Sequence, residues 1–136
     1  MIETHLWPLT ITLGSDVCHL QDIRRSMDAW LETEGCDDET RKAIVLATHE
    51  AAANAIEHSQ TNSEITVRAR TDDGLIVLEV SDHGQWKHEP PDFDQRGRGL
   101  MMISRLVDEL EIDADGPGTT IRMMVRRDGN DARSFV

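Results

Sequence analysis

Residues 49–58 read His-Glu-Ala-Ala-Ala-Asn-Ala-Ile-Glu-His, and they place a carboxylate and a carboxamide one turn apart on a segment of high helix propensity. We expect this helix to be capped by Asp37 or Asp38 and to run to about Ser59. Its predicted inward stripe consists of Ile44, Ala47, Thr48, Ala51 and Ala55. Because most of these side chains are small, the helix can lie close to the layer that it covers.

The segments on either side of this helix carry clear strand and helix patterns. Alternating apolar residues predict half-buried strands, a continuous apolar run predicts a buried central strand, and apolar residues at helical spacing predict amphipathic helices. These elements are expected at residues 9–13 (strand), 17–31 (helix), 65–69 and 75–80 (strands), 100–110 (helix), 110–112 (a short strand) and 121–125 (strand). Val17 is placed on the apolar face of the first helix, and Leu110 fits either the second helix or the short strand.

The order of these elements predicts an α/β (α+β) two-layer sandwich. Asp72-Asp73-Gly74 favours a hairpin between two strands, so we expect a mixed, largely antiparallel sheet covered on one face by three helices. Residues 1–126 are assigned to one domain, and residues 127–136, which lack periodicity, to a flexible tail. Residues 83–96, which include two prolines, are interpreted as a loop.

Composition narrows the classes of function. A net charge of −12 over 136 residues argues against sequence-independent binding of DNA or RNA, which needs clustered cations, whereas an acidic surface can meet a basic protein. No apolar run approaches the roughly 20 residues that cross a bilayer, and no signal peptide is recognised. Cys18 and Cys36 are interpreted as free thiols, and the six histidines have no zinc-ligand spacing. A cytoplasmic location follows by elimination.

Glu50 and Asn54 are the first candidates for chemistry. They lie about 40° apart around the helix axis, at the rim of the inward stripe. An Asn amide oxygen is a suitable hard ligand for Mg²⁺, and a carboxylate one turn earlier can accept a proton from a nucleophile. Taken alone, the pair also fits a surface helix whose Glu and Asn are only solvated.

Three later segments add candidates for a ligand site. Asp82 follows the buried central strand and can accept the exocyclic amine of adenine, while Gly84 allows the backbone to approach a flat ring. Taken alone, Asp82-His83-Gly84 also fits a common Asp-x-Gly turn with a structural role.

Gly97 and Gly99 flank Arg98 just before the helix that begins near Leu100. Glycines let backbone N–H groups turn toward an anion, and a helix N-terminus favours negative charge. Further on, Gly116-Pro117-Gly118 leads into a strand that opens with Thr119-Thr120, where a Thr hydroxyl can face an adenine pocket. Taken alone, Gly97 and Gly99 also fit a flexible start to the helix. Gly116-Pro117-Gly118 alone also fits an ordinary hairpin turn.

In this order, the four segments resemble the boxes of the GHKL (Bergerat-fold) ATPases, the group that includes histidine kinases, gyrase-type ATPases and Hsp90. The resemblance extends from about Leu9 to Val125. The matching residues are Glu50, Asn54, Ala55 and His58 (N box), Asp82 and Gly84 (first glycine box), Gly97, Gly99 and Leu100 (second), and Gly118 and Thr120 (third). The short chain and the Arg-Gly-Arg-Gly-Leu run look most like the small bacterial anti-sigma-factor serine/threonine kinases.

The resemblance implies an anti-sigma factor that binds ATP and Mg²⁺, phosphorylates a STAS-domain anti-anti-sigma protein, sequesters a sigma factor and forms a homodimer. It implies that Glu50 is the general base, that Asn54 holds Mg²⁺ and that Asp82 and Thr120 read adenine. Residues 97–100 would cover the phosphates.

One position departs from the family pattern. The first glycine box usually reads Asp-x-Gly-x-Gly, and Trp86 stands here in place of its second glycine. A bulky ring at this point could weaken nucleotide binding. The alternative function is therefore a non-catalytic nucleotide-binding regulatory module that sequesters a protein partner. A detached sensor-kinase domain is a further alternative, although the phosphoacceptor helix pair is missing.

Overall fold

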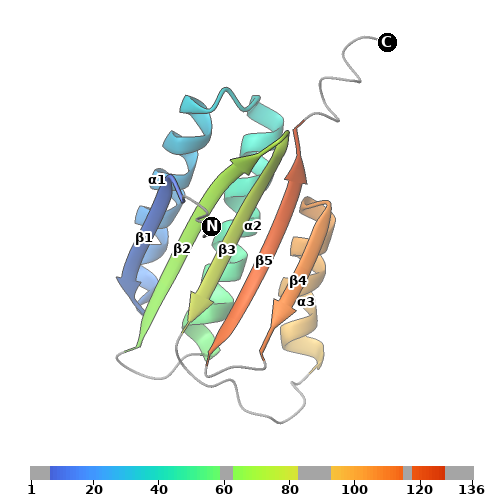
Figure 1. Ribbon diagram of the computed structural model, residues 1–136. Helices are drawn as coiled ribbons and strands as arrows, with labels where there is room; N and C mark the ends of the chain where they lie inside the picture. Colours follow the sequence, from blue (N-terminus) through green and yellow to red (C-terminus); the bar gives the residue numbers. More distant parts are fainter. Residues whose placement is uncertain (1–6, 59–62, 83–92, 115–117, 128–136) are drawn as a thin grey trace, which may run out of the picture.

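A five-stranded antiparallel sheet, covered on one face by helices, makes up the protein (Figure 1). The computed structural model describes residues 7–58, 63–82, 93–114 and 118–127, with residues 93–98 described by their backbone alone. The strands are β1 (Leu9–Gly14), β2 (Glu64–Asp72), β3 (Leu75–Asp82), β4 (Glu109–Asp113) and β5 (Thr119–Arg126). Their order is β1-β2-β3-β5-β4. The predicted sandwich is confirmed, but every described pair is antiparallel, so the sheet is not mixed.

The helices are the short 3₁₀-helix η1 (Val17–His19), α1 (Leu20–Thr33), α2 (Asp38–His58) and α3 (Phe93–Leu106). Asp37 caps α2 as predicted, because its Oδ1 accepts a hydrogen bond from the backbone N–H of Thr40 at 2.9 Å. The prediction for Val17 was wrong. It lies in η1, before α1 begins, and is 66% exposed, because the chain reaches the core face only at Leu20 and Ile23.

The start of α3 also differs from the prediction. α3 begins at Phe93, so the last four residues of the expected loop, and both Gly97 and Gly99, lie inside the helix. A glycine in a helix costs about 1 kcal/mol relative to alanine. Packing of the later apolar face, with Ile103 fully buried, supplies the compensating stability. The remaining residues of the expected loop, 83–92, lie outside the described residues.

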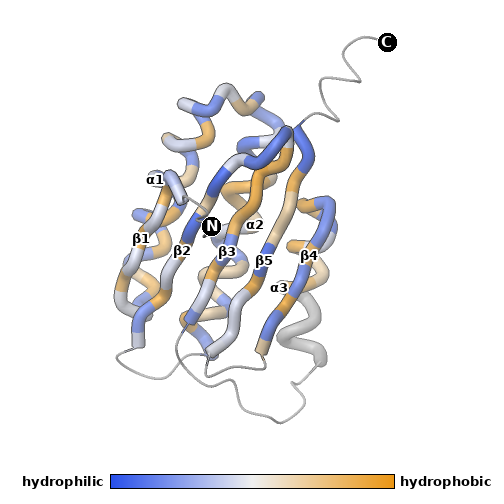
Figure 2. Tube along the Cα trace, in the orientation of Figure 1, coloured by the Kyte–Doolittle hydropathy of each residue, from blue (hydrophilic) through white to orange (hydrophobic). Residues whose placement is uncertain are grey.

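Local signals place the core and the central hairpin as expected. Asp73 and Gly74 have φ values of 51° and 82°, which is the left-handed geometry of a tight hairpin turn between β2 and β3. The predicted stripe of α2, which comprises Ile44, Ala47, Thr48, Ala51 and Ala55, is buried throughout. β3 is buried along most of its length, and Figure 2 shows a continuous apolar run in the upper part of the strand.

Arg127 makes hydrogen bonds to two other segments of the fold. Arg127 was predicted to start the tail, yet its backbone N–H donates to the carbonyl of Gly74 at 2.8 Å and its Nη2 donates to the carbonyl of Glu34 at 2.6 Å. Residues 128–136 of the predicted tail lie outside the described residues. Among the helices described, none has both the length and the apolar character of a membrane span.

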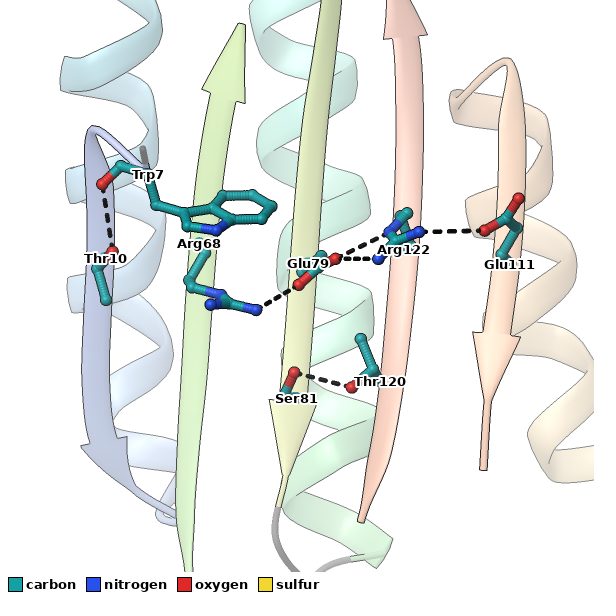
Figure 3. Close-up of polar contacts among 8 residues, drawn as sticks. All are labelled: Trp7, Thr10, Arg68, Glu79, Ser81, Glu111, Thr120 and Arg122. Atoms are coloured by element: carbon teal, nitrogen blue, oxygen red, sulfur yellow. Dashed lines mark hydrogen bonds and ion pairs between the residues drawn. The ribbon is translucent and has the colours of Figure 1, made fainter. Parts of the chain in front are cut away.

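The face of the sheet opposite the helices carries a polar network (Figure 3). Glu79 on β3 is only 3% exposed, and its carboxylate accepts hydrogen bonds from Arg68 of β2 at 2.6 Å and from Arg122 of β5 at 2.6 and 2.8 Å. Arg122 also lies 3.6 Å from Glu111 of β4. The guanidinium group of Arg68 stacks on the ring of Trp7, 4.5 Å from its centroid. This row of contacts ties four neighbouring strands together.

Glu79→Gln is expected to destabilise the fold by about 2 kcal/mol at neutral pH, because hydrogen bonds to charged groups contribute roughly 1.5–3 kcal/mol. The value lies below the upper limit because both arginines keep some solvent contact. Burial acts to raise the pKa of Glu79, but the hydrogen bonds from Arg122 and Arg68 outweigh it and lower the pKa. The stabilisation is therefore complete above the unfolded-state pKa, about 4.3, and is lost as the pH falls through the lower folded-state pKa.

Denaturant unfolding of both proteins at pH 7 and at pH 3 measures this effect. The difference in free energy of unfolding should shrink at the lower pH. Glu111→Gln is the matched control, because Glu111 is 60% exposed and makes only the longer contact, so its loss should cost less than about 0.5 kcal/mol. Equal losses in the two variants would show that the network does not depend on Glu79.

Candidate functional site

Several of the predicted site residues that the structure describes lie toward one end of the sheet. β3 ends and β5 begins there, and α2 runs toward this end while α3 starts from it (Figure 1). The Cα partner of Asp82, the last residue of β3, is Thr119, the first of β5. Asn54 of α2 contacts Gly99 of α3. Two pairs of residues that are far apart in the sequence are thus brought together.

Asn54 is held between α2 and α3. Its side chain is buried, with 8% of the residue exposed, and its Nδ2 has no hydrogen-bond partner among the described residues. The side chain lies directly against the backbone of Gly99. A buried amide without a partner in the protein is costly unless a ligand or water completes its bonds. The carboxamide oxygen is a hard ligand of the kind that Mg²⁺ accepts, so Asn54 fits the predicted metal role.

Glu50 lies half-buried one turn before Asn54. Arg41 donates a hydrogen bond to Asp28 at 2.9 Å, which places α1 along one flank of α2, and Gly99 places α3 along the other. The 40° offset from Asn54 turns Glu50 outward on the α3 flank. A carboxylate there is accessible to an incoming group and lies near the amide that could hold a metal.

Asp82 ends the apolar run of β3 and is 3% exposed. It shares the helix-covered face with Leu78 and Val80, because residues two apart in a strand point the same way. Thr119 is 2% exposed and lies beside it on the same face. A buried carboxylate and a buried hydroxyl therefore line the same end of the core, where they can hydrogen-bond the polar edge of a flat base.

Thr120 does not join this pair, which corrects the prediction that Thr120 and Asp82 read the same ring. Its hydroxyl lies on the open face of the sheet, 3.0 Å from Oγ of Ser81 (Figure 3). The physical reason is strand alternation: Ile121, Met123 and Val125 of β5 are buried against the helices, so Thr119 points inward and Thr120 outward. The sequence already held this signal in the phase of the apolar residues.

The structure describes the remaining predicted residues to different extents. Gly84 and the unusual Trp86 lie outside the described residues, and Gly97 and Arg98 are placed only by the backbone of α3. Leu100, which was predicted to cover phosphates, is half-buried and packs against the core. Leu100 therefore holds the middle of α3 against the core.

A separate cavity of about 210 Å³ lies at the opposite end of the sheet, beside the turn between β2 and β3. Asp73, Asp108, Glu109 and Arg126 are among its lining residues. Three carboxylates against one guanidinium disfavour an anionic ligand there. The end of the sheet near Asn54 and Asp82 is the better candidate for binding a phosphate compound.

The sequence from residue 13 to residue 125 matches the family model of the histidine kinase-like ATPase domain. The chain belongs to this family. The predicted GHKL resemblance is thereby confirmed over most of the chain. Binding of a nucleotide, and ATP-dependent phosphoryl transfer in general, are the chemistry that a histidine kinase-like ATPase domain supports.

Solved structures agree with this assignment. The structure of the RsbU and RsbW domains of Rv1364c from Mycobacterium tuberculosis matches with 31% identity and a TM-score of 0.72. The match covers 87% of this chain and 32% of that chain. The catalytic domain of histidine kinase ThkA matches with 14% identity and a TM-score of 0.57, covering 88% of this chain and 97% of that one. The histidine kinase AdeS of Acinetobacter baumannii matches with 13% identity and a TM-score of 0.56, covering 90% and 69%. At these identities the two kinases support the fold alone.

Proposed function

We propose that this histidine kinase-like ATPase domain is an anti-sigma factor with protein serine/threonine kinase activity. It would use ATP and Mg²⁺ to phosphorylate a STAS-domain anti-anti-sigma protein, and it would sequester a sigma factor once that antagonist is phosphorylated. The observation that carries the proposal is the 31% identity with a structure that contains an RsbW domain, over 87% of this chain. The motif resemblance to small anti-sigma-factor kinases supports the same branch of the family.

The geometry of the site suggests a division of roles. Asn54 Oδ1 would be a protein ligand to Mg²⁺, which supplies charge neutralisation at the triphosphate when bound. Asp82 would accept the adenine amine, and Thr119 replaces Thr120 as the proposed hydroxyl partner. The backbone of α3 at residues 97–99 would approach the phosphates from the N-terminal part of the helix, where negative charge is favoured.

Glu50 would act on the protein substrate. Its carboxylate would take the proton of the acceptor hydroxyl as that oxygen bonds to the γ-phosphorus of ATP. The bond between the γ-phosphorus and the oxygen that bridges it to the β-phosphate would break, and ADP would leave. Few protein groups need to participate, because phosphoryl transfer depends mainly on positioning and electrostatic stabilisation. The outward, half-buried position of Glu50 on the α3 flank suits a base that must meet a second protein.

The proposal also covers the setting in which the protein works. We propose a homodimer, on the strength of the motif resemblance, and a cytoplasmic location, which the sequence predicts by elimination. The net charge of −12 suits a basic face on the sigma factor or on the antagonist. Co-purification from cells, followed by transfer of labelled phosphate from ATP to each STAS-domain protein recovered, tests the partner assignment. Recovery of a sigma factor without any transfer would favour the non-catalytic alternative.

Nucleotide binding is expected to stabilise the fold. A ligand at 100 times its dissociation constant adds about 2.7 kcal/mol to the free energy of unfolding, so thermal melts should shift upward by several degrees with ATP and Mg²⁺. Asn54→Ala is the informative companion, because it should lose the part of the shift that depends on Mg²⁺. No shift at millimolar ATP with Mg²⁺, together with no heat of binding in calorimetry, would contradict the nucleotide site.

A further inference from the structure

Gly99 occupies a position where backbone conformation does not require glycine. Among the described residues, the glycines with positive φ are Gly35 and Gly74, at the end of α1 and in the hairpin turn. Gly99 lies inside α3, where alanine would be the better helix former. A reason other than conformational freedom must therefore explain the absence of a side chain.

The space beside Gly99 supplies that reason. A Cβ built on Gly99 would lie 3.0 Å from Nδ2, 3.2 Å from Oδ1 and 3.5 Å from Cγ of Asn54. By contrast, a Cβ on Gly14 would meet no atom closer than His19 Nε2 at 4.0 Å. The carboxamide of Asn54 therefore crowds the point where a Cβ at position 99 would lie, and one of the two groups would have to shift by a few tenths of an ångström.

Packing also limits the orientation of Asn54. The residue is 8% exposed, and its Nδ2 makes no hydrogen bond to any described residue. Hydrogen bonds to that nitrogen therefore do not fix the amide plane. All three atoms of the carboxamide lie within 3.5 Å of the point that a Cβ on Gly99 would occupy.

We propose that Gly99 is a positioning residue for Asn54. Its missing side chain lets α3 press against the carboxamide and orients Oδ1, so that the position of α3 is coupled to the metal ligand. The coupling to Mg²⁺ rests on the proposed function, whereas the packing relation between the two residues does not.

A double-mutant cycle without nucleotide tests the packing relation. Gly99→Ala should lower the melting temperature when Asn54 is present, because the new methyl group collides with the amide. The same change in an Asn54→Ala background should raise it by roughly 3 °C, because the gain in helix propensity is then unopposed. Gly14→Ala is the control for an added methyl group in open space and should change the melting temperature equally in both backgrounds.

If Gly99→Ala alone fails to fold, folding of the double variant gives the same answer. A rise in melting temperature in both backgrounds, or a fall in both, would overturn the proposal.

The second readout is the ratio of ATP affinities with and without Mg²⁺. Gly99→Ala should reduce this ratio toward its value in Asn54→Ala. If Gly99 only stabilised the fold, its replacement would leave the ratio unchanged. An unchanged ratio in Gly99→Ala would overturn the coupling to the metal. If the cycle shows the reversal of sign but the parent binds no nucleotide, the positioning of Asn54 stands and the proposed function fails. If the parent binds ATP with Mg²⁺ but the cycle is additive, the positioning fails and the proposed function stands.

Discussion

Glu50→Gln is expected to lower the rate of phosphoryl transfer to the substrate protein by about 10²- to 10⁴-fold, the usual effect of removing a general base. This corresponds to about 2.7–5.4 kcal/mol of barrier at 1.36 kcal/mol per decade. The variant should keep its fold, because Glu50 is only half-buried and the amide has nearly the same shape. Nucleotide binding should also survive, since we assign the metal and adenine contacts to Asn54 and Asp82.

The measurement compares the transfer rate with the affinity for the sigma factor in the same protein. Sequestration needs no chemistry, so sigma binding should be unchanged in Glu50→Gln. Glu57→Gln is the matched control, because Glu57 is an exposed residue of α2, two turns further on and on a similar side of the helix. Equal rates in the parent and in Glu50→Gln would remove Glu50 from the mechanism. An equal loss of transfer rate in Glu57→Gln would show that the negative charge of α2, and not a specific base at Glu50, determines the rate.

Elements with strong local signals could be predicted from the sequence. The alanine-rich α2 has a capping Asp37 and a consistent inward stripe, and the structure places both as expected. The Asp73-Gly74 turn fixes the β2–β3 hairpin, because both positions adopt left-handed backbone geometry that those residues tolerate. In these segments, propensity and pattern favour the same conformation, so tertiary context had nothing to override.

The errors arose where tertiary packing or strand phase decides. Two glycines near the start of α3 suggested a loop, yet the helix begins at Phe93, because its later turns pack into the core. Thr120 was chosen over Thr119 by motif position, although the alternation of β5 points Thr119 inward. The burial of Glu79 follows from its place in the predicted central strand, but its pairing with Arg122 could not be predicted, because that residue of β5 lies 43 residues further along the sequence. The contact between Asn54 and Gly99 likewise depends on how α2 and α3 pack.

Asp82→Asn is expected to weaken ATP binding by about 10- to 100-fold, since a hydrogen bond to a charged group contributes roughly 1.5–3 kcal/mol. It should also reduce the preference for ATP over GTP, because the Asn side chain can donate to the oxygen that guanine carries in place of the adenine amine. Calorimetric titration with ATP and with GTP measures both effects. Circular dichroism checks that this buried substitution keeps the fold. Unchanged selectivity in a folded variant would remove Asp82 from base recognition.

Two adjacent threonines supply the sharpest control for this assignment. Thr119 and Thr120 carry the same hydroxyl one residue apart on β5, yet the first is 2% exposed beside Asp82 and the second bonds Ser81 on the opposite face at 3.0 Å. Replacement of either by valine removes a hydroxyl and keeps the shape. If adenine binds on the helix-covered face, Thr119→Val should weaken ATP binding and Thr120→Val should leave it within about two-fold of the parent. The reverse order would place the base on the open face and would return the role to Thr120, because no ligand at the strand end can reach both hydroxyls from one side of the sheet.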